Sequence, residues 1–138
     1  MKQKKAINEK KIIASLAVLL VLIIDQFFKN FAENFVVTTC NRGIAFGIGG
    51  DFTILILIVV GLVFWILTQE KRFLPTIGLA LIFAGGISNV VDRIKYGCVR
   101  DFIAILNFPA FNLADIAIFA GVLIILIFYN RFAENPTL

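Results

Sequence analysis

The sequence predicts an all-α integral membrane protein, and three observations support this prediction. Of its 138 residues, 60% are hydrophobic and 16% are charged, whereas soluble domains average about 45–50% and about 25%. The mean hydropathy is +0.96. The apolar residues form long runs instead of the alternating pattern of a membrane β-barrel. A single membrane domain over residues 1–138 is expected.

Four apolar segments are long enough to cross a hydrocarbon core of about 30 Å, which takes about 17–25 helical residues. Helices are expected because lipid offers no hydrogen-bond partners to an open backbone. Pro75 falls in the first turn of the third segment, where its missing N–H is tolerated. The predicted spans are residues 12–28, 52–68, 73–91 and 111–129.

Lysine and arginine residues predict the orientation, because loops rich in them stay in the cytoplasm. Four spans place both termini on one side, with eight of the 13 Lys and Arg residues there and five on the other side. Both termini are therefore expected to be cytoplasmic. The first span is expected to be retained, because no small-x-small cleavage site follows it. Nucleic acid is not an expected partner, because no basic face interleaves with stacking aromatics.

The two cysteines, Cys40 and Cys98, both fall on the predicted outer side. They could form a disulfide in an oxidising compartment. The alternative is that they are two small apolar residues near the membrane surface, and the sequence favours this second interpretation. Neither belongs to a CxxC motif, which weakens a redox or metal role.

The chain has no histidine. This removes Ser-His-Asp and Cys-His catalysis and the usual zinc sites. A Ser–Lys dyad is unsupported, because Ser15 lies in the inner half of the first span and Ser88 has no lysine on its own helix face. An enzyme built from this sequence is therefore expected to use aspartates.

The polar residues of the spans gather at their outer ends, whereas the cytoplasmic halves are aliphatic. This asymmetry predicts a site at the outer membrane boundary. A charge in hydrocarbon costs about 2.5–3.5 kcal/mol on insertion scales, so such residues need a reason to be there. The clusters contain Asp25, Gln26 and Lys29; the stretch 41–50; the stretch 85–93; and Asp101, Asn112 and Asp115.

Two of these clusters also have a structural interpretation on a helix face. Asp25 and Lys29 are four residues apart, which suits a surface salt bridge of about 0.2–0.5 kcal/mol. Asn89, Asp92 and Arg93 share one face and could be a solvated helix end. Asn89 lies within an apolar run, and polar residues there usually face protein or water, so function is favoured for this group.

Local structure also offers explanations at the other clusters. Asn112 is a good N-cap with Asp115 three residues on, which is an acidic version of the capping box. Gly85 and Gly86 are expected to let a neighbouring helix approach closely. The stretch NRGIAFG, taken alone, is typical of a turn. None of these explains why all the clusters fall on the same side.

Taken in order, the clusters form five motifs: Asp25-x-x-x-Lys29, Asn41-x-Gly43-x-Ala45-Phe46, Gly85-Gly86-x-x-Asn89-x-x-Asp92-Arg93, Val99-Arg100-Asp101-Phe102 and Phe111-Asn112-x-Ala114-Asp115. This series resembles lipoprotein signal peptidase, the type II signal peptidase of bacteria, from Asp25 to about Ile118. The resemblance implies a multi-pass aspartic endopeptidase of the bacterial cytoplasmic membrane, with its site near the extracytoplasmic face. It would cleave a prolipoprotein before a cysteine that carries diacylglycerol.

The resemblance also assigns residues and partners. Asp101 and Asp115 match the two catalytic acids. A monomer in membrane lipid is expected, with no metal and no organic cofactor, and globomycin is expected to inhibit it. The residues that match supporting positions are Asn89, Asp92, Arg93 and Asn112, which would order the acids, and Asp25, Lys29, Asn41 and Gly43, which would surround the site and substrate.

Three features depart from the family pattern. The stretch 29–41, which forms a small substrate-cradling sheet in relatives, is short, so a trimmed β cradle is expected. The stretch 101–115 is also short, so ILNFPAF would serve as an abbreviated flap. Arg100 stands where a hydrophobic residue is usual.

Arg93 is expected to pair with Asp92.

The chemistry expected of two close carboxylates is the activation of water through one shared proton. Two rival functions remain at this stage. A small channel or proton-coupled carrier could use the same intramembrane polar residues, but an ion path must continue across the bilayer. A scaffold subunit with polar helix ends is the other, although it would not need five ordered clusters.

Overall fold

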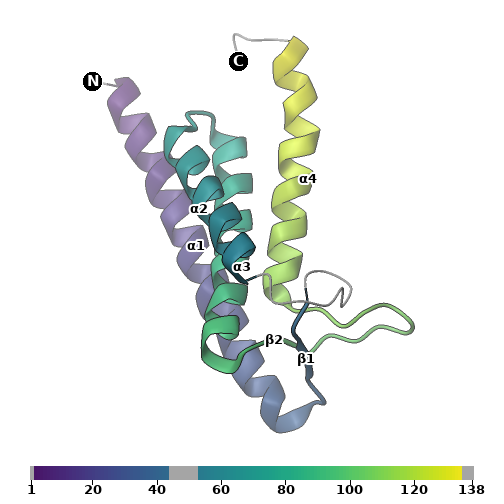
Figure 1. Ribbon diagram of the computed structural model, residues 1–138. Coiled ribbons are helices and arrows are strands. Elements are labelled where there is room, and N and C mark those ends of the chain that lie inside the picture. The colour runs from purple at the N-terminus through teal and green to yellow at the C-terminus, as the bar shows by residue number, and fades with distance from the viewer. Residues whose placement is uncertain (1, 44–52, 135–138) are drawn as a thin grey trace.

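The structure is a computed structural model that describes residues 2–43 and 53–134. Within these ranges the chain forms four helices and a two-stranded antiparallel sheet. The start of α1, the turn between α2 and α3, and the end of α4 lie at one end of the molecule, and the sheet lies at the other (Figure 1). The elements are α1 (Lys2–Phe35), β1 (Thr39–Asn41), α2 (Thr53–Gln69), α3 (Phe73–Tyr96), β2 (Val99–Asp101) and α4 (Leu113–Glu134).

Helix α3 is the centre of the bundle, since α1, α2 and α4 all pack against it. Many large apolar side chains elsewhere on the helices are exposed: Leu16, Ile23, Ile58 and Phe119 are examples. Extensive exposed apolar surface is typical of protein that faces lipid. Among the described residues, two segments meet the length and hydropathy of a membrane span, Asn8–Phe35 and Phe73–Tyr96, whereas α2 and the apolar part of α4 are shorter.

A helix occurs at each of the four predicted segments, but the bounds differ: α1 already begins at Lys2, α3 continues to Tyr96 and α4 continues to Glu134. The predicted span stopped at residue 28, but α1 continues to Phe35. Its last two turns remain helical because they carry Asn30 and Glu33, whose side chains both bind Arg100. The polar residues that suggested a span end are thus part of the same helix.

Small residues bring α4 against α3, as the glycines suggested. A Cβ atom added to Gly85 would collide with the Ala114 carbonyl, and one added to Gly121 would collide with the Gly78 carbonyl. The two backbones are therefore in direct contact along the helix pair. Gly86 is turned to α2, where an added Cβ would lie 2.8 Å from Val60.

The sheet joins the segment after α1 to the segment after α3. Its register pairs Thr39 with Asp101, Cys40 with Arg100 and Asn41 with Val99. This is the small β element expected after the first helix. Beyond it, residues 103–111 form a loop closed by an antiparallel bridge between Ile103 and Phe111.

The cysteines form a disulfide, so the preferred sequence interpretation of two unpaired apolar residues was wrong. Cys40 and Cys98 are joined by an S–S bond of 2.05 Å across a sequence separation of 58 residues. Cys40 belongs to β1 and Cys98 immediately precedes β2, so sheet pairing brings their Cα atoms within 5.5 Å. The sequence separation alone gave no sign of this proximity.

Candidate active site

Asp101 and Asp115 come from different elements and meet at the sheet end of the bundle. Asp101 is the last residue of β2, and Asp115 lies in the first turn of α4. Asp101 is buried and Asp115 is half-buried. Both line the same cavity of about 660 Å³. The sequence-predicted acid pair is therefore brought together next to a space that can hold a ligand.

Asn112 connects the two acids. Its side-chain Nδ2 donates to Asp101 Oδ1 at 2.7 Å, and its backbone N–H donates to Asp115 Oδ2 at 3.2 Å. In return, the Asp115 backbone N–H donates to Asn112 Oδ1 at 3.0 Å. This reciprocal pair is the capping box that the sequence predicted, and it fixes Asp115 relative to the start of α4.

Asn89 holds the other side of Asp115. Its Nδ2 donates to Asp115 Oδ1 at 2.9 Å, and its Oδ1 accepts from Lys29 Nζ at 2.9 Å and from Asn112 Nδ2 at 3.2 Å. Because an amide has a distinct donor and acceptor end, the Lys29 ammonium orients Asn89 so that its NH₂ group faces the carboxylate. Lys29 thus acts on the acid pair through Asn89.

Asn41 completes the contacts of Asp101 from β1. Its Nδ2 donates to Asp101 Oδ2 at 3.1 Å, and its Oδ1 accepts the Gly43 backbone N–H at 3.0 Å. Arg93 Nη2 donates to the Gly43 carbonyl at 2.8 Å. Through these contacts Asn41, Gly43 and Arg93 hold the segment beside Asp101 in place. The remainder of the glycine-bearing stretch, residues 44–50, lies outside the described residues.

Behind the acids lies a buried group of four charges, two negative and two positive. Lys29 Nζ lies 2.7 Å from Asp25 Oδ2 and 3.3 Å from Asp92 Oδ2, and all three side chains have 0% exposure. Arg100 Nη2 lies 2.9 Å from Asp92 Oδ1. The group is electrically balanced, as buried charges must be to avoid a large desolvation cost.

Two sequence interpretations are corrected by this group. The Asp25–Lys29 pair is fully buried and is not the surface salt bridge considered as the alternative. The ion pairs of Asp92 are made by Lys29 and Arg100, whereas Arg93, the expected partner, contacts the Gly43 carbonyl. Arg93 is one helical turn from Asn89 but is directed to the loop after β1.

Three residues to which sequence reasoning assigned no role at the site hold the charged group together. Ser88 Oγ donates to Asp25 Oδ2 at 2.6 Å, and Gln26 Nε2 donates to Asp92 Oδ1 at 3.0 Å. Arg100, noted only as a departure, contacts Asp92, Gln26, Asn30 and Glu33. A signal was present: residues 26, 30 and 33 are spaced i, i+4 and i+7, which aligns them on one helix face.

The surroundings of Asp101 make its carboxyl easier to protonate than an ordinary aspartate. Burial raises the pKa of its carboxyl and the charge of Asp115 raises it further, while hydrogen bonds from Asn41 and Asn112 oppose the rise, giving a pKa of about 6. Asp101 is in β2, outside the helices. A raised pKa on one of two neighbouring acids is the behaviour expected of carboxylates that share a proton.

The cavity beside the acids has polar groups at one side and apolar walls elsewhere. Gly86 and Ile56 contribute from α3 and α2, and Ile116, Phe119 and Val122 contribute from α4. Phe108 to Phe111 of the loop after β2 form a further wall, at the position expected of the flap. Among residues 2–43 and 53–134, no group of three or more acidic or cysteine side chains is arranged to hold a metal ion.

Comparison with solved structures defines the class of protein. A bacterial membrane enzyme solved by the in meso method at 2.3 Å resolution aligns with a TM-score of 0.78 and 24% identity, over 88% of this chain and 90% of that chain. A second, solved at 1.9 Å, aligns with a TM-score of 0.71 and 25% identity, over 83% and 90%. The chain therefore has the fold of a helical bacterial membrane enzyme.

Comparison of sequences defines the family. The model described as signal peptidase (SPase) II matches residues 17–131. The lipoprotein signal peptidase of Streptococcus pneumoniae strain R6 is 36% identical, over 86% of this chain and 93% of that protein. The one from Pelodictyon phaeoclathratiforme is 35% identical, over 87% and 92%. The chain belongs to the signal peptidase II family, a family of bacterial membrane proteases.

Proposed function

We propose that the protein is an aspartic endopeptidase that removes signal peptides from lipid-modified prolipoproteins, cutting before the diacylglyceryl-cysteine. The observation that carries this proposal is the Asn112 bridge between Asp101 and Asp115, beside a cavity that both acids line. Membership of the signal peptidase II family and the names of the lipoprotein signal peptidases it resembles support the substrate class.

The acid pair activates water through one shared proton. The raised pKa of Asp101 makes it the more easily protonated of the two, so in the reactive form Asp101 carries the shared proton and the half-buried Asp115 is the base. Asp115 takes a proton from a water molecule, whose oxygen attacks the scissile carbonyl carbon while the Asp101 hydroxyl donates a hydrogen bond to the carbonyl oxygen. As the tetrahedral intermediate collapses, the C–N bond breaks and Asp115 returns the proton to the leaving nitrogen.

The other polar residues act as positioning groups. Asn89 and Asn112 hold the acids in place, and the buried charges of Asp25, Lys29, Asp92 and Arg100 fix Asn89 and the start of β2. These amide contacts matter for catalysis because a displacement of about 1 Å can cost a hundredfold in rate.

The substrate reaches the acids from within the membrane. Its signal helix and acyl chains are apolar, and the cavity offers them the walls contributed by α4 and by Phe108 to Phe111. Each buried CH₂ of an acyl chain contributes about 0.8 kcal/mol, so much of the binding energy is independent of the peptide sequence. In this proposal all four helices cross the bilayer, both termini are cytoplasmic, and a monomer is sufficient.

The test is processing of a lipid-modified precursor by the purified protein and by two variants. Asp101→Asn and Asp115→Asn should each reduce turnover by at least about 10³-fold, because asparagine is nearly isosteric but cannot carry the proton. The matched control is Glu9→Gln, which removes an exposed acid at the opposite end and should leave turnover unchanged. Near-normal turnover in either aspartate variant would remove that residue from the mechanism.

Globomycin gives a second readout of the same site. We expect it to bind the parent protein at the acid pair and to inhibit cleavage. The Asp101→Ala variant should bind it less tightly, because it disrupts the hydrogen bonds to the acid pair, which carries one negative charge, and a hydrogen bond to a charged group is worth about 1.5–3 kcal/mol. If substitution of either acid left globomycin binding unchanged, the inhibitor would not contact the acid pair.

A further inference from the structure

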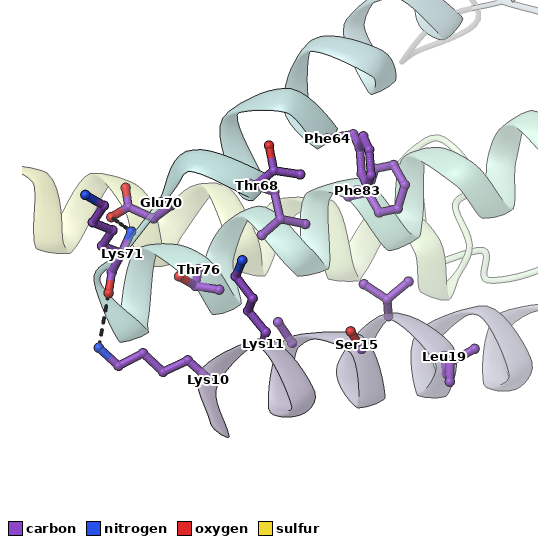
Figure 2. Close-up of a pocket in the computed structure, with 13 residues that line it drawn as sticks. Lys10, Lys11, Ser15, Leu19, Phe64, Thr68, Glu70, Lys71, Thr76 and Phe83 are labelled. Carbon is purple, nitrogen blue, oxygen red and sulfur yellow. Dashed lines mark hydrogen bonds between the residues drawn. The ribbon is translucent and has the colours of Figure 1, made fainter. Parts of the chain in front are cut away.

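A second cavity lies at the other end of the bundle, far from the acids. It has a volume of about 460 Å³, is open on one side, and is lined by residues of α1, α2, α3 and the turn between α2 and α3 (Figure 2). Its inner part is apolar: Val18 and Leu19 come from α1, and Leu67 comes from α2. The rings of Phe64 and Phe83, whose centroids are 5.2 Å apart, close it between α2 and α3.

The outer part of this cavity is lined by three lysines. Lys10 Nζ donates to the Lys71 carbonyl at 3.1 Å, which ties α1 to the turn between α2 and α3. In Figure 2 the Lys11 side chain rises from α1 toward the other two helices. Lys11 is exposed, and within the described part of the chain its ammonium has no hydrogen-bond or ion-pair partner.

The acid beside these lysines is already neutralised. Glu70 Oε2 lies 2.8 Å from Arg72 Nη2, and Glu70 Oε1 accepts from Arg72 Nε at 2.9 Å and from the backbone N–H groups of Lys71 and Arg72. The ammonium groups of Lys10, Lys11 and Lys71 are therefore not balanced by an acid of the cavity wall. An anion is the chemistry that complements them.

The length of the cavity indicates what the anion is attached to. Lys10 and Leu19 are nine residues apart on α1, which is about 13 Å at 1.5 Å per residue. Half of a hydrocarbon core is about 15 Å thick. The cavity thus extends from a cationic mouth to about the depth of one leaflet, with apolar walls throughout its inner part. These are the dimensions and polarity of a phospholipid rather than of a free inorganic anion.

We infer that this cavity binds one anionic phospholipid of the cytoplasmic leaflet. The phosphate lies at the mouth beside Lys10 and Lys11, and an acyl chain lies between α1 and α2 against Phe64 and Phe83. Basic pockets between membrane helices on the cytoplasmic side are suited to anionic head groups. The inference depends on the membrane placement proposed above. It does not depend on the protease activity, because the cavity shares no residue with the acid pair.

The bound lipid would brace the cytoplasmic half of the bundle. Helices α1 and α2 each pack on α3, and the cavity separates their inner faces at this end. A lipid that binds only the folded bundle stabilises it by mass action. The melting temperature of the delipidated protein should therefore rise with added anionic phospholipid.

The experiment measures lipid binding to the delipidated protein in detergent, by native mass spectrometry and by thermal unfolding. Dioleoyl phosphatidylglycerol should bind and raise the melting temperature, whereas dioleoyl phosphatidylcholine should bind at least about tenfold more weakly. Lys11→Gln should weaken phosphatidylglycerol binding about fivefold, which corresponds to about 1 kcal/mol per lysine. Lys95→Gln, an exposed lysine at the opposite end, is the matched control and should bind like the parent.

A second pair of variants tests the apolar part. Leu19 lines the cavity and is 55% exposed, whereas Leu16 is 60% exposed and does not line it. Leu19→Trp should fill the space and weaken phosphatidylglycerol binding by at least fivefold, and Leu16→Trp should not. Inorganic phosphate at equal concentration should not raise the melting temperature.

Four results would overturn the inference. These are equal binding of the two lipids, parent-like binding by Lys11→Gln, equal effects of Leu19→Trp and Leu16→Trp, and stabilisation by inorganic phosphate equal to that by the lipid. Cleavage activity is not part of the readout, so failure of the proposed protease function leaves this test intact.

Discussion

Asp101 and Asp115 are held by amide groups and not by direct contact with a cation. The donors are Asn41 and Asn112 for Asp101, and Asn89 with the Asn112 backbone for Asp115. A cation in contact with either carboxylate would hold it ionised. The Lys29 ammonium contacts Asn89, which in turn contacts Asp115. This spacing orders the pair while leaving it able to keep a proton.

The raised pKa of Asp101 predicts a pH-dependent stability. The pKa is about 6 in the folded protein against a reference of 3.8, so the folded state binds this proton more tightly than the unfolded state. The free energy of unfolding that Asp101 contributes therefore falls as pH rises from about 4 to about 6 and is level above that range. Asp101→Asn abolishes this loss.

Melting temperatures in detergent from pH 4 to pH 8 check this prediction. The difference, variant minus parent, should increase between pH 4 and pH 6 and then stay constant. Glu9→Gln, which changes an exposed acid, serves as control and should show no such rise. A flat difference for Asp101→Asn would mean that this carboxyl does not titrate near 6.

Arg100 is predicted to be a stability determinant. Arg100→Met leaves the buried Asp92 without its guanidinium partner and removes the contact with the Tyr96 ring at 4.2 Å. Loss of one partner from a buried ion pair costs about 3–5 kcal/mol. Arg42→Met, at an exposed position, should change stability by less than about 0.5 kcal/mol. Thermal unfolding of both variants is the measurement, and equal small effects would contradict this role.

At the scale of elements, the hydrophobic runs predicted the position of each helix along the chain, but not its full length, and α1 shows this most clearly. The predicted first span covers residues 12–28, whereas α1 ends at Phe35. Polar residues in the second half of α1 contact Asn89, Asp92 and Arg100, which follow 60 to 74 residues later in the chain. Hydropathy reports exposure to lipid, so it cannot recognise a polar helix face that is buried by a distant strand.

The disulfide was not predicted for the same reason, because it depends on contacts between distant parts of the chain. Its two cysteines became neighbours only because β1 pairs with β2, and this pairing depends on the register of two three-residue strands. By contrast, the contacts of Asn112 with Asp115 were predictable, because a capping box is a local motif with a fixed spacing. Local spacing thus predicted one half of the candidate site, and the tertiary pairing that supplies Asp101 and Asn41 could be reached only through the family resemblance.

The contact between α3 and α4 predicts a contrast between two glycines. Gly121→Ala should destabilise the protein, because its Cβ would collide with the Gly78 carbonyl and would lie 2.8 Å from Ile82. We expect a cost of about 1–3 kcal/mol, which is typical of overpacking. Gly61→Ala in α2 meets nothing within 4 Å and should be neutral or stabilising by about 0.5–1 kcal/mol, as alanine favours helix. Comparable melting temperatures for the two variants would contradict the close packing.

The whole molecule has two chemically different ends. One end carries the acid pair, the balanced buried charges and the disulfide. The other carries the start of α1, the α2–α3 turn and the cluster of lysines around the second cavity (Figure 1). Disulfides persist in extracytoplasmic compartments, and lysine-rich loops remain in the cytoplasm. Both arguments predict the same orientation, although they depend on different residues.

This polarity leads to a topology prediction. Reporter fusions after Leu138 and near Glu70 should both report the cytoplasm, and a fusion near Gly49 should report the outside. The fusion at Gly49 is the most informative, since it follows β1 and its disulfide cysteine along the chain. If the start of α1 is cytoplasmic, an external signal at Leu138 would mean an odd number of crossings. The start of α1 and the end of α4 would then lie on opposite sides of the membrane. That result would remove the basis for the lipid site as well as for the access of prolipoproteins to Asp101 and Asp115.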